Sequence, residues 1–275
     1  SQDHGFPFGS VTYKELDMNS YPADTSAVAV VLNEFAEAYV DDEDENDLIF
    51  KYHTKIKILK QQGVRLGTFE VSAYKQDNRS EKVELVKGSS FNYENGSMKE
   101  SKMDSKAVFT SNENKYWDVT RFAIPNVKVG TVIDVQYTIR SPFIYKFRNW
   151  EFQSEIPKVH SEYWAKIPAN FKFNITLKGF QKLDKSEGEV IRDCFRPGGQ
   201  SADCSLNKWA MKNIPAMPEE DYMTARSNYL SAINFELSEI QYFDGRIDRF
   251  TKQWKDAEHE LRMSDSFGVQ LRKGK

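Results

Sequence analysis

Residues 132–139 are Val132-Ile133-Asp134-Val135-Gln136-Tyr137-Thr138-Ile139, and every second side chain from Ile133 onward is apolar. Alternation with a period of two places these side chains on one face of a β-strand. The stretch therefore predicts a strand with one buried face. The Ser141-Pro142 pair predicts its end, because proline lacks the N–H that a central strand needs.

The same pattern recurs along the chain, with turn residues between the segments. Strand-like segments are found at residues 51–59, 64–74, 81–87, 118–122, 150–153, 163–167, 171–177 and 233–237. Asn95-Gly96 predicts a tight hairpin turn, because both residues tolerate a positive φ angle. The sequence thus predicts a mainly β protein, with a large antiparallel β-sandwich-like domain over residues 25–218.

The two ends differ from this central region. Residues 1–24 contain Gly5, Pro7, Gly9 and Pro22, and they predict an arm that lies on the surface.

Residues 219–275 predict a linker strand and then a short helical C-terminal segment. Between Arg246 and Met263 apolar side chains recur at helical spacing, at Ile247, Phe250, Trp254, Ala257 and Leu261. Such a stripe needs a partner surface, which is either the sandwich itself or a following domain.

Composition describes a soluble globular chain and excludes some classes of function. The 275 residues are 39% hydrophobic, 29% charged and 13% aromatic, and the high aromatic content favours β surfaces. A net charge of −3 offers no basic field for nucleic acid. No apolar run approaches the length of a transmembrane helix, and any signal peptide has been removed or lies outside this sequence.

Two cysteines, Cys194 and Cys204, flank a turn that contains Pro197-Gly198-Gly199. They could face each other across a hairpin as a disulfide, worth roughly 2–3 kcal/mol in an oxidising compartment. The alternative is a pair of reduced, buried thiols. Neither cysteine precedes a predicted helix start, so neither is expected to be a nucleophile.

The histidines and acids give no metal centre or cofactor site. His4, His53, His160 and His259 lack the spacing of a zinc site. His53 is expected to be exposed or half-buried rather than a catalytic base. The acidic run at residues 41–47 predicts a solvated hairpin loop rather than a calcium site, because it lacks the fixed ligand spacing and central glycine.

The aromatic side chains leave two interpretations open. Trp117, Trp150, Tyr163 and Trp164 could form a platform for a carbohydrate or peptide, or they could fill the sandwich core. A further alternative is a hydrolase with an unrecognised pair of acids, which can come from any two strands.

Several short segments carry a more specific signal through their order and spacing. They are Phe8-Gly9, residues 53–58, residues 122–125, residues 129–137, residues 150–153 with Ile156-Pro157, residues 161–163 with Ile167-Pro168, and residues 213–216 with Glu219-Glu220. Together they resemble a family of domains of unknown function found immediately before transglutaminase-like domains in secreted or cell-envelope bacterial proteins.

The resemblance implies a non-catalytic accessory domain, active in substrate recognition or scaffolding outside the cytoplasm. Its partner would be an adjacent transglutaminase-like domain in the same polypeptide, which would carry a Cys-His-Asp triad. Trp254 and Ser266-Phe267-Gly268 look like the lead-in to that domain. No residue of this sequence matches the triad, so no catalytic position is assigned.

Overall fold

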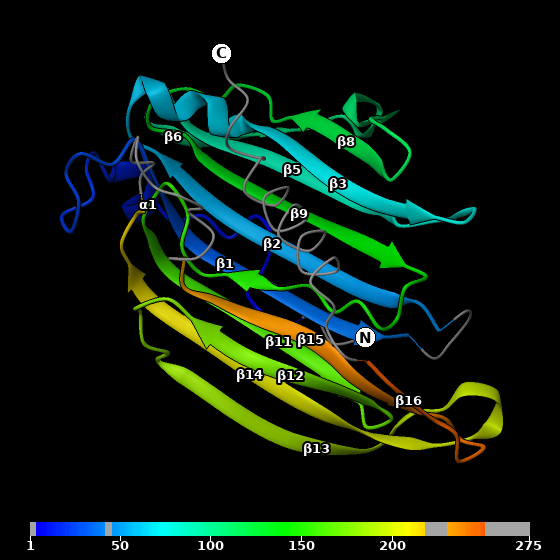
Figure 1. Ribbon diagram of the computed structural model, residues 1–275. Helices are drawn as coiled ribbons and strands as arrows, with labels where there is room; N and C mark the ends of the chain where they lie inside the picture. The colour runs from blue at the N-terminus through cyan, green and yellow to red at the C-terminus, as the bar shows by residue number, and fades with distance from the viewer. Residues whose placement is uncertain (1–3, 42–45, 218–229, 251–275) are drawn as a thin grey trace.

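A computed structural model describes residues 4–41, 46–217 and 230–250 of the chain (Figure 1). Strands make up 58% of it and helices 8%, in several mostly antiparallel sheets. The prediction of a mainly β protein is therefore confirmed.

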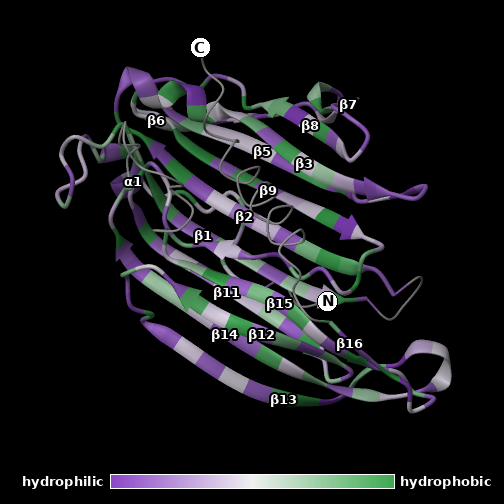
Figure 2. Cartoon of the chain, in the orientation of Figure 1, coloured by the Kyte–Doolittle hydropathy of each residue, from purple (hydrophilic) through white to green (hydrophobic). Residues whose placement is uncertain are grey.

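The main layer is a sheet of eight strands in the order β13-β14-β11-β1-β2-β9-β5-β6. Hydrophobic and hydrophilic residues alternate along its long strands (Figure 2). Its strands are β1 (Ala29–Val40), β2 (Leu48–Ile58), β5 (Lys82–Glu94), β6 (Ser97–Lys102), β9 (Val132–Ser141), β11 (Lys158–Pro168), β13 (Lys185–Phe195) and β14 (Ala202–Ile214).

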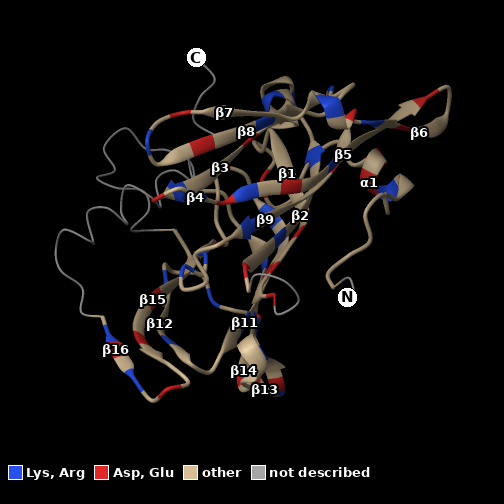
Figure 3. Cartoon of the chain, turned by 90° about the vertical axis from the view of Figure 1, so that its right-hand side faces the viewer, with Lys and Arg blue, Asp and Glu red and all other residues tan. Residues whose placement is uncertain are grey.

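Two smaller sheets lie side by side on one face of this layer, which we call the inner face (Figure 3). One joins β10 (Trp150–Glu151), β15 (Ala232–Gln241), β12 (Phe171–Lys178) and β16 (Ile247–Arg249). The other joins β4 (Arg79–Ser80), β3 (Thr68–Gln76), β8 (Trp117–Ala123) and β7 (Phe109–Asn112). One apolar core includes Val135 of β9, Phe122 of β8 and Phe235 of β15, so it joins all three sheets.

The opposite, outer face of the large sheet is covered by the N-terminal arm, residues 4–24 (Figure 3). The arm contains the short helix α1 (Tyr13–Asp17), which a capping box between Thr12 and Glu15 begins. The structure also has three short 3₁₀ helices, η1 (Gln61–Gly67), η2 (Ser105–Ala107) and η3 (Pro197–Gly199).

One strand pair departs from the expected antiparallel arrangement. β1 and β11 run parallel, with Phe35 opposite Glu162. Parallel neighbours need a long crossover. Between β9 and β11 the chain leaves the large sheet, adds β10 to a smaller one and then returns.

Irregularities in two strands explain where the side-chain alternation fails. A register shift between Val31 and Asn33 of β1 exchanges the two faces of that strand, which is why its sequence has no clear period. In β5 a shift between Glu84 and Lys87 leaves Leu85 exposed with a positive φ angle, so the alternation expected over residues 81–87 breaks there.

Both predicted hairpins are present. Asn95 and Gly96 connect β5 to β6 with φ angles of 52° and 79°. β1 and β2 pair from Val40 opposite Leu48, so the acidic run connects two antiparallel neighbours. Residues 42–45 of that run lie outside the described residues.

Two local predictions are wrong. Residues 64–67, expected to begin a strand, lie in η1 instead. Residues 247–249, expected to begin the C-terminal helix, form β16 and pair with β15, because backbone pairing overrides the helical spacing of their side chains. The rest of the predicted helix, residues 251–263, lies outside the described residues.

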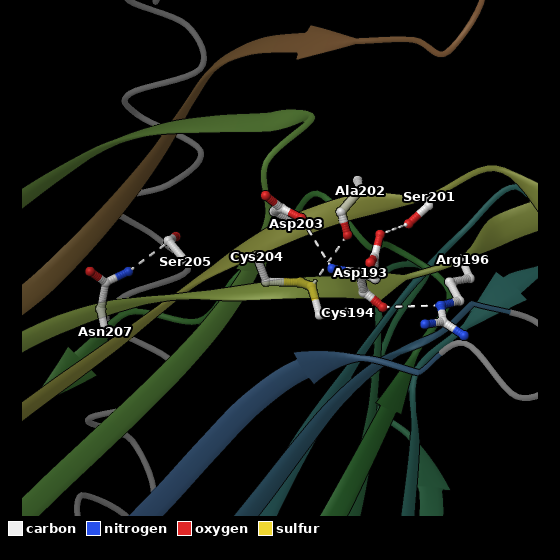
Figure 4. Close-up of a disulfide and its surroundings, with 9 residues drawn as sticks. All are labelled: Asp193, Cys194, Arg196, Ser201, Ala202, Asp203, Cys204, Ser205 and Asn207. Atoms are coloured by element: carbon white, nitrogen blue, oxygen red, sulfur yellow. Dashed lines mark hydrogen bonds between the residues drawn. A yellow bond between two sulfur atoms is a disulfide. The ribbon is translucent and has the colours of Figure 1, made fainter.

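A disulfide joins Cys194 and Cys204 at the end of the β13–β14 hairpin, with their Cα atoms 5.8 Å apart (Figure 4). Gly198 and Gly199 adopt positive φ angles in the intervening turn. Asp193 tightens the same turn, because its carboxylate accepts a hydrogen bond from Ser201 Oγ at 2.7 Å. Of the two alternatives for the cysteines, the structure therefore has the disulfide.

Replacing both cysteines by alanine is expected to lower the free energy of unfolding by roughly 2–3 kcal/mol, because the unfolded chain regains the freedom of the closed loop. Urea unfolding measures the change, and reductant should bring the unaltered protein to the same stability. Ser201→Ala in the same turn is the control and should cost less than about 1 kcal/mol. Equal midpoints for the double variant and the parent protein would contradict this expectation.

Candidate functional site

The outer face of β2 carries a row of buried polar side chains, formed by His53, Lys55 and Lys57. The row is buried because the N-terminal arm covers it. The expectation that His53 is exposed or half-buried is therefore wrong, since local alternation carries no information about a distant segment that covers the face.

His53 and Asp134 form a close pair in this row. Nε2 of His53 lies 2.5 Å from Oδ1 of the fully buried Asp134. The other carboxylate oxygen accepts the backbone N–H of Gly9 at 2.7 Å. The ring of Phe6 stacks on the imidazole with 3.8 Å between centroids. The arm thus closes a pair that would resemble a catalytic base and its orienting acid if it were open.

The two lysines of the row hold the arm in the same way. Lys55 Nζ donates to Glu15 at 2.6 Å and to the carbonyl oxygen of Ser10 at 3.1 Å. Lys57 Nζ donates to the carbonyl oxygens of Leu16 at 2.7 Å and Gly130 at 2.6 Å.

Lys57 titrates unusually for a lysine. Burial lowers its pKa to about 8, against an opposing effect of Asp17, which raises it.

A second polar network lies inside the molecule, on the inner face of the large sheet. Glu34 accepts hydrogen bonds from Lys158 at 2.7 Å, Ser161 at 2.7 Å and Tyr52 at 2.9 Å. Trp150 Nε1 extends it by donating to Ser161 Oγ at 3.1 Å. Burial and the Glu34 carboxylate raise the pKa of Tyr52 well above its ordinary value. The network links β1, β2, β11 and β10, and its polar groups are satisfied by one another.

Glu162 organises a third group on the outer face. It accepts from His160 at 3.0 Å, Lys185 at 2.8 Å and the indole N–H of Trp164 at 2.8 Å. Burial raises the pKa of Glu162, but these hydrogen bonds outweigh it and lower the pKa to about 2. Lys208 lies over the Trp164 ring, 4.2 Å from its centroid. Glu162 therefore stays ionised and ties β11 to β13.

The structure does not bring the four candidate aromatic residues together into one platform. Trp150 and Tyr163 are buried in the core and stack with 5.1 Å between their centroids. Trp164 follows Tyr163 in β11 and so lies on the outer face, while Trp117 packs edge-on against Tyr74 at 5.3 Å.

Within the described ranges, no group of three or more His, Cys, Asp or Glu side chains could hold a metal ion. Three acids share one partner: the carboxylates of Asp41, Asp47 and Glu84 lie 3.5 to 3.6 Å from the Arg140 guanidinium. The Arg140 guanidinium offsets the negative charge of these three carboxylates.

The sequence of residues 46–218 matches a family model described as a Domain of Unknown Function with a solved structure, DUF3857. The chain belongs to the DUF3857 family. The matched residues begin just before β2 and end just after β14, so the arm, β1 and β15 of this DUF3857 protein lie outside them. No curated protein matches the sequence.

Among solved structures, this DUF3857 chain is similar to a "putative protease" from Parabacteroides distasonis ATCC 8503. The TM-score is 0.59 at 12% identity, over 77% of this chain and 41% of that protein. The likeness shows a shared fold, and the chain spans less than half of that protein. An M1 zinc metallopeptidase from Deinococcus radiodurans gives a TM-score of 0.25 at 9% identity, over 71% of this chain and 45% of that one.

Sequence reasoning missed the partners of the polar row rather than the row itself. Lys51, His53, Lys55 and Lys57 occupy alternate positions of a strand whose other face is apolar. A central strand with a charged face needs polar groups from another segment to cover that face. This requirement was the signal that could have predicted the burial of the row. Nothing local identified Glu15 or Gly9 as that cover.

Lys57 gives a prediction about pH. The folded protein loses the Lys57 proton near pH 8 and the unfolded chain near the ordinary pKa of 10.5, so the unfolded state binds more protons between these values. The free energy of unfolding of the parent protein should therefore rise by about 2 kcal/mol from pH 8 to pH 10, relative to Lys57→Met. Urea unfolding at several pH values measures the difference, in which the titration of other groups cancels. Parallel pH profiles would contradict the burial of a charged Lys57.

Asp134→Ala tests the contacts that hold the N-terminal arm against the large sheet. It removes the acceptor for His53 and Gly9 and is expected to cost about 3 kcal/mol of unfolding free energy, with faster hydrogen exchange in the arm. Glu70→Ala, which breaks the half-exposed Glu70–Arg121 pair, is the control and should cost less than about 1 kcal/mol. Unchanged exchange in the arm of the Asp134 variant would show that the arm is held by other contacts.

Proposed function

We propose that this chain is a non-catalytic accessory domain, serving substrate recognition or scaffolding in a larger extracytoplasmic protein with a transglutaminase-like domain. The proposal rests on the observation that the candidate reactive groups of the chain are either bonded to each other or enclosed. Cys194 and Cys204 are joined in a disulfide, and the His53–Asp134 pair is sealed beneath Phe6. A nucleophile needs both an activating base and access to substrate.

Membership of a larger protein is supported by the comparison with the Parabacteroides protein. That protein is called a "putative protease", and this chain resembles 41% of it. The link to a transglutaminase-like domain rests on the resemblance of the short sequence segments described above. An accessory domain of this kind would hold or present a substrate while a neighbouring domain carries out the reaction.

A place outside the cytoplasm is supported by the disulfide, because such bonds persist mainly in oxidising compartments. None of the helices in the described part of the chain is long and apolar enough to cross a bilayer.

The alternative of a ligand platform made of surface aromatics has less support. Lys208 and His4 lie against the Trp164 ring, so a flat ligand would have to displace them. Trp150 and Tyr163 are buried, so Trp117 is left, and its one partly exposed ring is a small surface for a glycan.

The purified chain is expected to show no hydrolysis of labelled casein and no glutamine–lysine cross-linking above a protein-free blank. It should also incorporate no iodoacetamide in denaturant without reductant, because the disulfide leaves Cys194 and Cys204 no thiol to alkylate. A cooperative thermal transition of the same sample is the control for folding. Turnover that copurifies with the folded chain would overturn the proposal.

A further inference from the structure

The strand β12 has a free edge. In the sheet order β10-β15-β12 it is the last strand, and among the described residues it pairs only with β15. Its sequence from Phe171 to Lys178 contains no proline. An edge strand of this length presents unpaired N–H and C=O groups that another strand can use.

Apolar side chains of β12 extend beyond the covered part of the core. Ile175 lies opposite Phe235 and Leu177 opposite Ile233, so these pairs share the inward face of the small sheet. Phe235 and Ile233 are buried, but Ile175 is 36% exposed and Leu177 is 44% exposed. The inward face is therefore uncovered along β12.

The inner face of the large sheet is also uncovered at its edge strand β13. Val190 of β13 lies opposite Ser205, which in turn lies opposite the buried Ile167 of β11, so Val190 shares the inner face. Val190 is nevertheless 64% exposed. On the same face of β13, Gly188 carries no side chain to fill the space. The inward side chains of Ile175, Leu177 and Val190 are therefore open to solvent at this side.

Two lysines beside this open side have no ionic partner in the described part of the chain. Lys178 ends β12 and Lys182 follows it, and neither forms an ion pair with a described residue. At the other end of β12, Lys172 is neutralised by Glu239 at 2.9 Å. The excess positive charge is therefore confined to the C-terminal end of the strand.

We propose that the free edge of β12 binds an extended peptide by strand addition. The peptide would pair its backbone with β12 and place alternate apolar side chains over Ile175 and Leu177. An acidic residue would lie next to Lys178 and Lys182. Antiparallel pairing places that acidic residue at the N-terminal end of the peptide, and it is the more stable arrangement per residue.

A second copy of this chain fits the edge less well than a peptide with an acidic end. Antiparallel pairing of two β12 strands would bring Lys178 of one copy beside the Lys172–Glu239 pair of the other. That pair is already neutral and offers Lys178 no free acid, whereas an acidic peptide end does. The charge pattern of the edge therefore favours a different, acidic partner.

This inference deepens the recognition role proposed above and rests on it. The two can fail separately, because binding and catalysis are measured in different assays. A chain that binds no peptide and has no activity would still be compatible with scaffolding.

The experiment uses the full chain and a fluorescein-labelled probe, Ac-DDVTVTV-amide, followed by fluorescence anisotropy. Saturable binding below ~1 mM is expected. Leu177→Asp should weaken it at least about tenfold, because it places an acid on the apolar contact, and Lys178→Glu should weaken it similarly. The control, Phe109→Asp on the exposed strand β7, should leave the affinity unchanged.

Two further probes separate strand addition from other modes of binding. The same peptide with alternate backbone nitrogens methylated should not bind, since it cannot complete the ladder of hydrogen bonds. The peptide with lysines in place of the acids should bind at least about tenfold more weakly. No saturation by ~1 mM, equal binding of the methylated peptide, or equal affinity in Leu177→Asp would overturn the proposal. Self-association of the chain that Leu177→Asp abolishes would overturn it too, because the occupant would then be a second copy.

Discussion

The architecture depends on how the outer face of β2 is neutralised. This strand lies in the middle of the large sheet, and both of its faces are buried. One face is mainly apolar, but the other carries His53, Lys55 and Lys57, whose burial without partners would cost several kcal/mol each. The arm supplies the missing carboxylate and carbonyl groups, and Asp134 supplies one from the next strand. The arm therefore stabilises the sheet by satisfying these buried groups.

Local patterns in the sequence predicted what local forces decide. The strands and the Asn95-Gly96 turn follow from alternation and backbone preference. The turn between Cys194 and Cys204 made their disulfide one of two open alternatives. Contacts between distant segments were missed, because periodicity carries no information about them. Gly9 and Asp134 are 125 positions apart, and Glu34 and Lys158 are 124 apart. The parallel neighbour of β1 was missed for the same reason.

The aromatic residues show a limit of a different kind. Tyr163 and Trp164 are neighbours in a strand, so one must face the core and the other the outer surface. Composition does not distinguish the two residues. Only the register of β11 against β1 and β14 decides which of them faces the core. In this protein Tyr163 is in the core, while Trp164 packs beneath Lys208. A candidate site assembled from residue types alone therefore mixed the two faces of one sheet.

The contrast between the two sides of the molecule bears on function. On the outer face, His53 and Asp134 have the geometry of an acid–base pair, yet both are enclosed and Phe6 occupies the space that a substrate would need. Their polar groups are used to hold the arm. At β12 the opposite holds, because no strand within the described ranges pairs with its outer edge, and apolar side chains there are exposed. The groups that the described structure leaves unused lie at the edge of the small sheet, and this is the reason for proposing peptide binding there rather than at the histidine.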